Sequence, residues 1–246
     1  MSPLGRSNPT VKVVLLLVVS LSTLFLLDVG VLLTLYLLGV VVALTAARVG
    51  VRALAVAQVP FALFGVGLVL VNALTRPGDP WVEGAAVRVT HEGLVVGVAL
   101  ALRGMVIGVL TVAFLATTPP RDLMVSLAEH ARLSPRYAYA LLAGHRMLEA
   151  MPRRWATVRA AQAVRAPLGR DGRPRLGVRD FGRATFTLLV GSVRASERIA
   201  LAMESRGLAA GPRTVWRPVP LGARDAVVAL VVLGTLAAVV AVGAVV

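Results

Sequence analysis

Two arginines at the ends of helical stretches are the residues whose type and spacing best fit a chemical role. Arg165 closes the run Gln162-Ala-Val-Arg-Ala-Pro, and Arg206 closes the run Met203-Glu-Ser-Arg-Gly-Leu. Both have small neighbours and are followed by helix breakers. Each guanidinium should therefore project from a helix end whose backbone another surface can approach closely. A guanidinium can bind a carboxylate or carbonyl groups through two parallel hydrogen bonds, which a lysine cannot do. We therefore predict that both side chains dock into grooves of partner proteins.

A purely structural role for these arginines is the alternative. A cation near a helix C-terminus interacts favourably with the helix dipole by about 0.3–1 kcal/mol, and arginines are common in basic loops. The recurrence of the same arrangement 41 residues apart favours the docking role.

The sequence holds none of the common catalytic or metal-binding patterns. Cysteine is absent, and His91, His130 and His145 show no metal-ligand spacing with acids. Neither Gly-x-Ser-x-Gly nor His-Glu-x-x-His occurs, and the single lysine, Lys12, does not follow a phosphate-binding glycine loop. We predict no cofactor and no ATPase site in this chain.

The composition predicts a polytopic membrane protein. Hydrophobic residues make up 57% of the 246 positions, and the mean hydropathy is +0.82. Apolar runs of roughly spanning length occur at Val11–Leu27, Val29–Thr45, Ala53–Leu74, Leu94–Thr117 and Ala226–Val246. The first two meet at Asp28 and should form a tight helical hairpin. The first run is interpreted as a retained span, because no small-residue cleavage site follows it.

The positions of the basic residues predict the orientation of these spans. Residues 118–224 carry nineteen arginines against seven acids. Basic residues also precede the first span and follow the second, and with five spans all three places fall on one side, the cytoplasm. Arg76–Glu92 and the C-terminus then lie outside. We divide the chain into spans 1–4 (1–117), a cytoplasmic block (118–224) and a last span (225–246).

Three helices are predicted in the cytoplasmic block. They cover about Arg121–Leu133, Pro135–Arg165 and Phe181–Arg206, with Pro152 a kink in the second. The third helix is apolar in its first half and could enter the membrane. A sixth span there would place Arg165 and Arg206 on opposite sides of the bilayer.

Arg103 lies near the middle of the fourth apolar run, where a charge costs about 2.5–3.5 kcal/mol. We predict a structural or coupling role; the alternative is that it snorkels or sits near a helix end. In the same run, two Gly-x-x-x-Gly pairs beginning at Gly93 and Gly104 should form one small face that packs inside the chain.

Taken in order, these residues resemble the transmembrane coupling subunit of energy-coupling factor (ECF) ABC transporters, the CbiQ-like T component that includes the cobalt-transport version. The matching positions are Asn8-Pro9-Thr10-x-Lys12, Arg103, Thr117-Thr118-Pro119 with Asp122-Leu123, Pro135, Arg146, Glu149, Gln162-x-x-Arg165 and Ala202-Met203-Glu204-x-Arg206-Gly207. One departure is Val164-Arg165-Ala166-Pro167, where the family usually has Ala-Arg-Gly and only the arginine is kept.

The resemblance implies an all-α, non-catalytic scaffold with about five transmembrane helices and three coupling helices before the last span. Its partners would be two ABC-type ATPases, which bind ATP and magnesium, and a membrane-embedded subunit that binds a vitamin or a metal ion. The implied ATPase-docking residues are Val164, Arg165, Ala166, Ser205, Arg206 and Gly207. The implied coupling or structural residues are Arg103, Thr117, Thr118, Pro119, Arg146, Glu149, Gln162 and Glu204.

Three other functions remain as alternatives. A stand-alone permease should have several polar residues lining a cavity in its spans, and beyond Arg103 these are few. An intramembrane enzyme needs a nucleophile or metal at membrane depth. A tethered binder of nucleic acid or anionic lipid should show strong salt dependence, but aromatic side chains that could stack on bases are few in the basic block.

Overall fold

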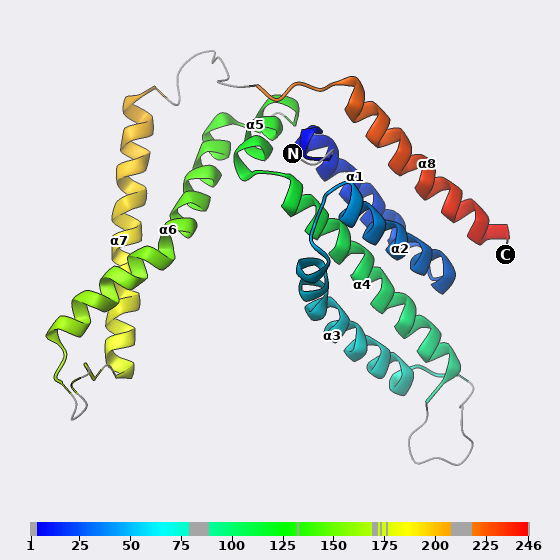
Figure 1. Cartoon of the computed structure of the whole chain (residues 1–246), viewed down its shortest axis with the longest axis horizontal. Helices are drawn as coiled ribbons and strands as arrows, with labels where there is room; N and C mark the ends of the chain where they lie inside the picture. The colour runs from blue at the N-terminus through cyan, green and yellow to red at the C-terminus, as the bar shows by residue number, and fades with distance from the viewer. Residues whose placement is uncertain are drawn as a thin grey trace. The chain divides into compact units, whose positions relative to one another are not determined.

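The computed structural model describes residues 4–78, 89–131, 133–168, 172, 174–175, 177–207 and 218–245. These residues are helical with no strand, so the predicted all-α membrane fold is confirmed (Figure 1). The elements are the 3-10 helix η1 (Leu4–Arg6) and the helices α1 (Pro9–Leu24), α2 (Val29–Thr45), α3 (Val51–Thr75), α4 (His91–Thr117), α5 (Pro120–His130), α6 (Pro135–Arg165), α7 (Val178–Ser205) and α8 (Ala223–Val245). The predicted exterior segment Arg76–Glu92 and the loop after Leu168 fall largely outside the described residues.

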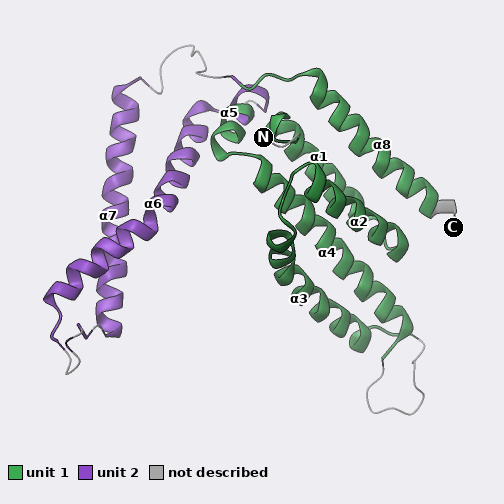
Figure 2. Cartoon of the chain, in the orientation of Figure 1, with its two compact units in different colours: residues 1–126, 219–246 green, residues 127–218 purple. Residues whose placement is uncertain are grey.

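The chain forms two compact units, which Figure 2 colours separately. The membrane unit comprises residues 1–126 and 219–246, and the arginine-rich unit comprises residues 127–218. Helix α5 begins in the membrane unit and ends in the arginine-rich unit.

Helices α3, α4 and α8 are long and apolar enough to cross a membrane. Helices α1 and α2 are apolar but shorter, with 16 and 17 residues. At 1.5 Å per residue they reach about 24–26 Å, against a hydrocarbon core of about 30 Å.

The first span was predicted to continue to Leu27, but the helix stops at Leu24. Asp28 then starts α2, because its carboxylate accepts a hydrogen bond from the Val31 amide at 2.8 Å.

Helix α4 packs against α3, α2 and α1, and close approach to α3 depends on glycine. A Cβ atom at Gly97 would come within 2.7 Å of the Val69 Cα, and one at Gly108 within 2.9 Å of the Phe61 ring. Gly104 has open space around it, so only part of the predicted glycine face packs inside the chain.

In the arginine-rich unit, α6 and α7 run antiparallel and cross (Figure 1). Helix α6 continues through Pro152. The Trp155 and Phe181 rings pack edge to face with their centroids 5.2 Å apart, and the buried Ala184 leaves room for the close approach of the helices. Helix α7 begins three residues earlier than predicted. The reason is that the Asp180 carboxylate accepts a hydrogen bond from the Gly177 amide and caps the first turn.

Candidate functional site

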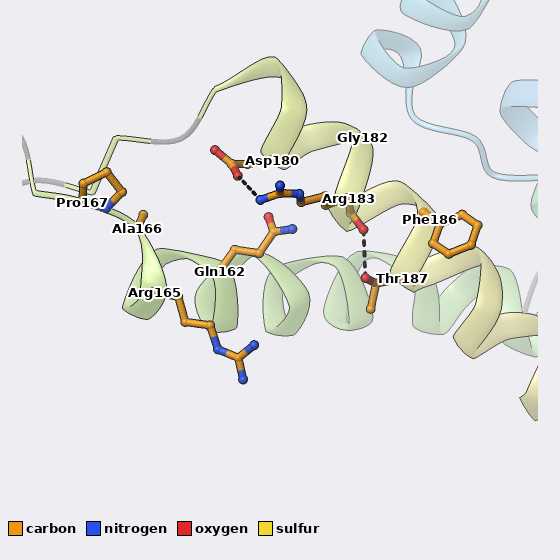
Figure 3. A pocket seen from close by; sticks show the side chains of 9 residues that line it. All are labelled: Gln162, Arg165, Ala166, Pro167, Asp180, Gly182, Arg183, Phe186 and Thr187. Atoms are coloured by element: carbon orange, nitrogen blue, oxygen red, sulfur yellow. Dashed lines mark hydrogen bonds and ion pairs between the residues drawn. The ribbon is translucent and has the colours of Figure 1, made fainter.

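Arg165 is the last residue of α6, and its side chain is exposed. The next residue, Ala166, has extended backbone (φ −79°, ψ 145°), as the position before Pro167 requires. Figure 3 shows the Arg165 guanidinium pointing away from α7, whereas the Gln162 side chain points toward it. Within the described residues, Arg165 makes no hydrogen bond or ion pair with its side chain. Its neighbour Val164 is 87% exposed.

Arg206 directly follows the last residue of α7, Ser205, and is also exposed. Gly207 then adopts φ +70°, and its amide donates to the Glu204 carbonyl at 2.9 Å. This left-handed residue ends the helix, and a residue with a Cβ would be strained there. In the described part of the chain no group bonds the Arg206 guanidinium.

The two helix ends are therefore built differently. A glycine is needed after Arg206 because φ is positive, while an extended alanine serves after Arg165 because a proline follows. This difference gives a physical reason for the departure noted in the sequence: the backbone at Ala166 does not adopt the conformation that favours glycine.

The two arginines lie at opposite ends of the crossed helices. Arg165 borders a groove of about 660 Å³ together with Asp180 and Arg183, which belong to the first turns of α7. Arg206 stands at the far end of α7, some 25 residues later. At 1.5 Å per residue the two positions are roughly 35–40 Å apart. At this separation the two guanidinium groups are too far apart to contact one and the same ligand group.

Three more residues predicted for this unit, Arg146, Glu149 and Gln162, belong to α6. Arg146 borders a second groove, of about 310 Å³, with Met203 of α7. The Glu149 carboxylate lies 3.4 Å from the His145 ring, one turn earlier. The Gln162 side-chain oxygen is buried and has no partner in the described residues.

A buried polar cluster lies in the membrane unit, where α1 begins. We call it the polar hub, and its members are Asn8, Thr10, Lys12, Thr117, Thr118, Ser126 and Asp225. Asn8 caps α1 by accepting from the Thr10 amide at 2.9 Å, and it donates through its amide group to the Val219 carbonyl. Its own backbone amide donates to Asp225 at 2.6 Å, and Ser126 donates to its side-chain oxygen. The hub joins α1, α5 and α8.

Lys12 links the hub to the end of α4. Its ammonium group donates to the Thr117 carbonyl at 3.1 Å and to the Thr118 hydroxyl at 3.4 Å. The Pro119 carbonyl then accepts from the Leu123 amide in α5. The Thr-Thr-Pro segment is therefore the point where α4 ends and α5 begins. The carbonyl of Thr117, which has no partner within α4, is bonded instead by the Lys12 ammonium group.

Ser126 and Asp225 were not predicted from the sequence. Asp225 carries a local signal, since an acid in the first turn of an apolar helix caps it: its other oxygen accepts from the Gly222 amide. Its partner Asn8 is 217 residues away, and no local pattern reveals such a contact.

Arg103 of α4 bonds the carbonyl oxygens at the end of α1. Its guanidinium donates to the Leu24 carbonyl at 3.2 Å and the Leu26 carbonyl at 2.9 Å. Leu24 is the last residue of α1, so its carbonyl has no partner within the helix, and Leu26 lies in the turn that follows. The acceptors of this intramembrane charge are thus backbone oxygens of the α1–α2 turn, and no acidic side chain is needed.

Among the described residues, no group of three His, Asp or Glu side chains is placed to hold a metal ion. The exposed Arg165 and Arg206 side chains and the buried polar hub are the described residues whose placement bears most directly on function.

The chain was compared with protein-family profiles and with curated proteins, and a family profile matches it. No curated protein matches the chain. A family profile described as cobalt transport protein, CbiQ, matches residues 1–214, which include α1 to α7 and both arginine ends. Because this match covers most of the chain, the protein belongs to the CbiQ family of cobalt transport proteins and is a membrane component of a transporter.

Proposed function

We propose that this chain is the transmembrane coupling subunit of an ECF-type importer. In this role it has no catalytic site of its own and binds two ATPase subunits through Arg165 and Arg206. The ATPases supply the ATP and magnesium chemistry. A small membrane-embedded subunit carries the substrate, a transition-metal ion or a vitamin. The family match to cobalt transport supports membership of a metal or cofactor uptake system.

The observation that carries the proposal is the pair of free, exposed guanidinium groups at opposite ends of α6 and α7. A cation without a partner in the described chain is available to bind a partner's carboxylates or carbonyls. A separation of roughly 35–40 Å along α7 suits two subunits lying side by side, one at each end. The docking residues on each side are then Val164–Ala166 and Ser205–Gly207.

The outer surfaces of α6 and α7 support binding of a third protein. Leu141 and Leu148, seven residues apart on one face of α6, are 56% and 65% exposed. Leu189 and Leu201 of α7 are 59% and 65% exposed. Exposed apolar side chains on a basic helical pair mark an interaction surface. In our proposal this surface contacts the substrate-binding subunit.

The coupling step follows from the geometry of the crossed pair. When the ATPases close on ATP, the two docked arginines move relative to each other, and the angle between α6 and α7 changes. The substrate-binding subunit seated on the pair then tilts and releases its cargo. Helix α5 and the Thr117–Pro119 segment connect the pair to the membrane unit along the chain.

The test is co-purification of the co-expressed ATPases with the double variant Arg165→Glu/Arg206→Glu. Losing a docked guanidinium typically costs roughly 2–5 kcal/mol, so each single variant should weaken binding by about 30-fold or more. The double variant should retain no ATPase. The matched control is Arg153→Glu/Arg194→Glu, which makes the same charge change at exposed positions within the same helices. Full ATPase retention by the double variant would refute the docking role.

The same cells distinguish the rival permease function. Uptake of labelled cobalt by this chain expressed without ATPases would favour a stand-alone permease. In the coupling proposal, uptake requires all the subunits and fails in the double variant.

A further inference from the structure

Three arginines from separate parts of the chain line one pocket in the membrane unit. Arg6 belongs to η1, Arg48 to the connection between α2 and α3, and Arg224 to the first turn of α8. The pocket has a volume of about 610 Å³. It lies where α1 and α8 begin and α2 ends, which is one boundary of the apolar helices. We call it the arginine pocket.

Hydrogen bonds between these segments hold the three arginines together. The Leu4 amide donates to the Ala46 carbonyl at 3.3 Å, which ties η1 to the end of α2. The Asn8 amide donates to the Asp225 carboxylate, which ties the start of α1 to the start of α8. These two hydrogen bonds connect the segments that carry the three arginines without any ligand.

The positive charge of the pocket is not neutralised within the described residues. None of the three guanidinium groups makes a hydrogen bond or ion pair there, and no acidic side chain lines the pocket. Asp225, next to Arg224 in α8, bonds the Asn8 and Gly222 amides and forms no ion pair with these arginines in the described residues, and its single charge can offset only one of the three cations. Three exposed cations that line one cavity repel one another, so an anion in that cavity is favoured.

The wall of the pocket below the arginines is apolar. It is formed by Ala223, Val227 and Val228 of α8. The same face continues with Leu230, which is 72% exposed, on a helix apolar enough to span a membrane. A cationic rim above an apolar, lipid-facing surface matches a molecule with an anionic head and a hydrocarbon chain.

Arg48 shows that the backbone is strained at this site. It has φ +57° and is the non-glycine residue with positive φ among the described residues. Glycine or asparagine would take this conformation more easily than arginine. Such strain is commonly retained where a side chain has a function.

We propose that the arginine pocket binds the phosphate headgroup of an anionic phospholipid, with an acyl chain lying along α8. A general excess of basic residues at a membrane face would spread over the surface. Here three cations from separate segments of the chain line one cavity. The site is distinct from the two arginine ends, so its test does not depend on ATPase docking.

The experiment is native mass spectrometry of the purified full chain in detergent, titrated with phosphatidylglycerol or phosphatidylcholine. The wild type should retain phosphatidylglycerol preferentially. The variant Arg6→Gln/Arg48→Gln/Arg224→Gln should bind it at least about tenfold more weakly. The control Arg136→Gln/Arg153→Gln/Arg194→Gln loses the same charge at exposed positions of the arginine-rich unit and should bind as the wild type does.

Two further measurements keep the proposal falsifiable if the triple variant folds poorly. Arg48→Gly removes one guanidinium and relieves the backbone strain, so it should raise the melting temperature while lowering phosphatidylglycerol retention. Millimolar inorganic phosphate should not displace the lipid. Equal lipid loss in the pocket and control variants, unchanged retention in Arg48→Gly, or displacement by phosphate would each overturn the lipid site.

Discussion

At the scale of single residues, Arg103 shows why a charge is kept in the middle of an apolar helix. Helix α1 ends at Leu24, and its last carbonyl groups have no partners in the helix. In a bilayer no water is available to bond them, so each would cost several kcal/mol. The Arg103 Nη2 group donates to one of these oxygens, that of Leu24, and to the Leu26 carbonyl in the turn that follows the helix. The free-energy cost of placing the charge within the membrane is offset because the carbonyl oxygens gain hydrogen-bond donors.

This capping role predicts a change in stability opposite in sign to the one that hydropathy alone predicts. Arg103→Leu makes α4 more apolar, which on insertion scales favours the membrane by about 2.5–3.5 kcal/mol. We expect the variant to be less stable instead, by roughly 2–4 kcal/mol, because the Leu24 and Leu26 carbonyls lose their donors. Thermal unfolding in detergent measures it, with the exposed Arg52→Leu as control. Equal or higher stability of Arg103→Leu would contradict the capping role.

The helix ends at Arg165 and Arg206 differ in which residue can follow the arginine. Gly207→Ala places a Cβ at φ +70° and should cost about 1–2 kcal/mol locally. Ala166→Gly should cost less than about 1 kcal/mol, because Ala166 is already extended. Amide hydrogen exchange in the last turns of α7 and α6 measures both effects. Equal effects at the two ends would show that the ends are not built differently.

At the scale of elements, the polar hub fixes where helices begin and end. The N-terminus of α1, the middle of α5 and the first turn of α8 meet at side chains that are almost completely buried: Asn8 is 1% exposed and Ser126 0%. Buried polar groups are stable only when they are fully bonded, so the positions of the three elements depend on one another.

A double-mutant cycle tests this dependence. Asn8→Ala and Ser126→Ala should each destabilise the protein by about 1–3 kcal/mol, because each leaves a buried partner unsatisfied. The double variant should lose less than the sum, with a coupling of about 1 kcal/mol or more. Ser126→Ala combined with Thr235→Ala is the control, since Thr235 bonds only within α8. Additive effects for Asn8 and Ser126 would rule out a connected hub.

The helices could be predicted from the sequence because their signals are local. The start of α6 at Pro135 and its end at Arg165 agree with the prediction, as Pro at the first turn and Pro167 after the end are strong signals. The predicted end of the first span at Leu27 was wrong: the apolar composition continues to Leu27, but helix α1 stops at Leu24. The acceptors of Arg103 and the Asn8–Asp225 contact could not be predicted, since packing between distant segments creates them.

At the scale of the whole molecule, the position of the chain in the membrane decides whether both arginines can reach ATPases. The chain has no cysteine, so single introduced cysteines report sidedness directly. Ala85→Cys, in the segment outside the described residues, should react with a membrane-impermeant maleimide in intact cells. Ser196→Cys in α7 should react only after the cells are permeabilised. Labelling of Ser196→Cys from outside would mean that α7 crosses the membrane and that the proposed docking geometry is wrong.

The shortness of α1 and α2 also affects the surrounding lipid. Their lengths of about 24–26 Å fall several ångströms short of an average hydrocarbon core of about 30 Å, whereas α3, α4 and α8, with 25, 27 and 23 residues, exceed it. A short spanning segment is accommodated by local thinning of the bilayer, by snorkelling of flanking residues or by association with other helices. We therefore expect the bilayer to be thinner beside the α1–α2 hairpin than beside α3.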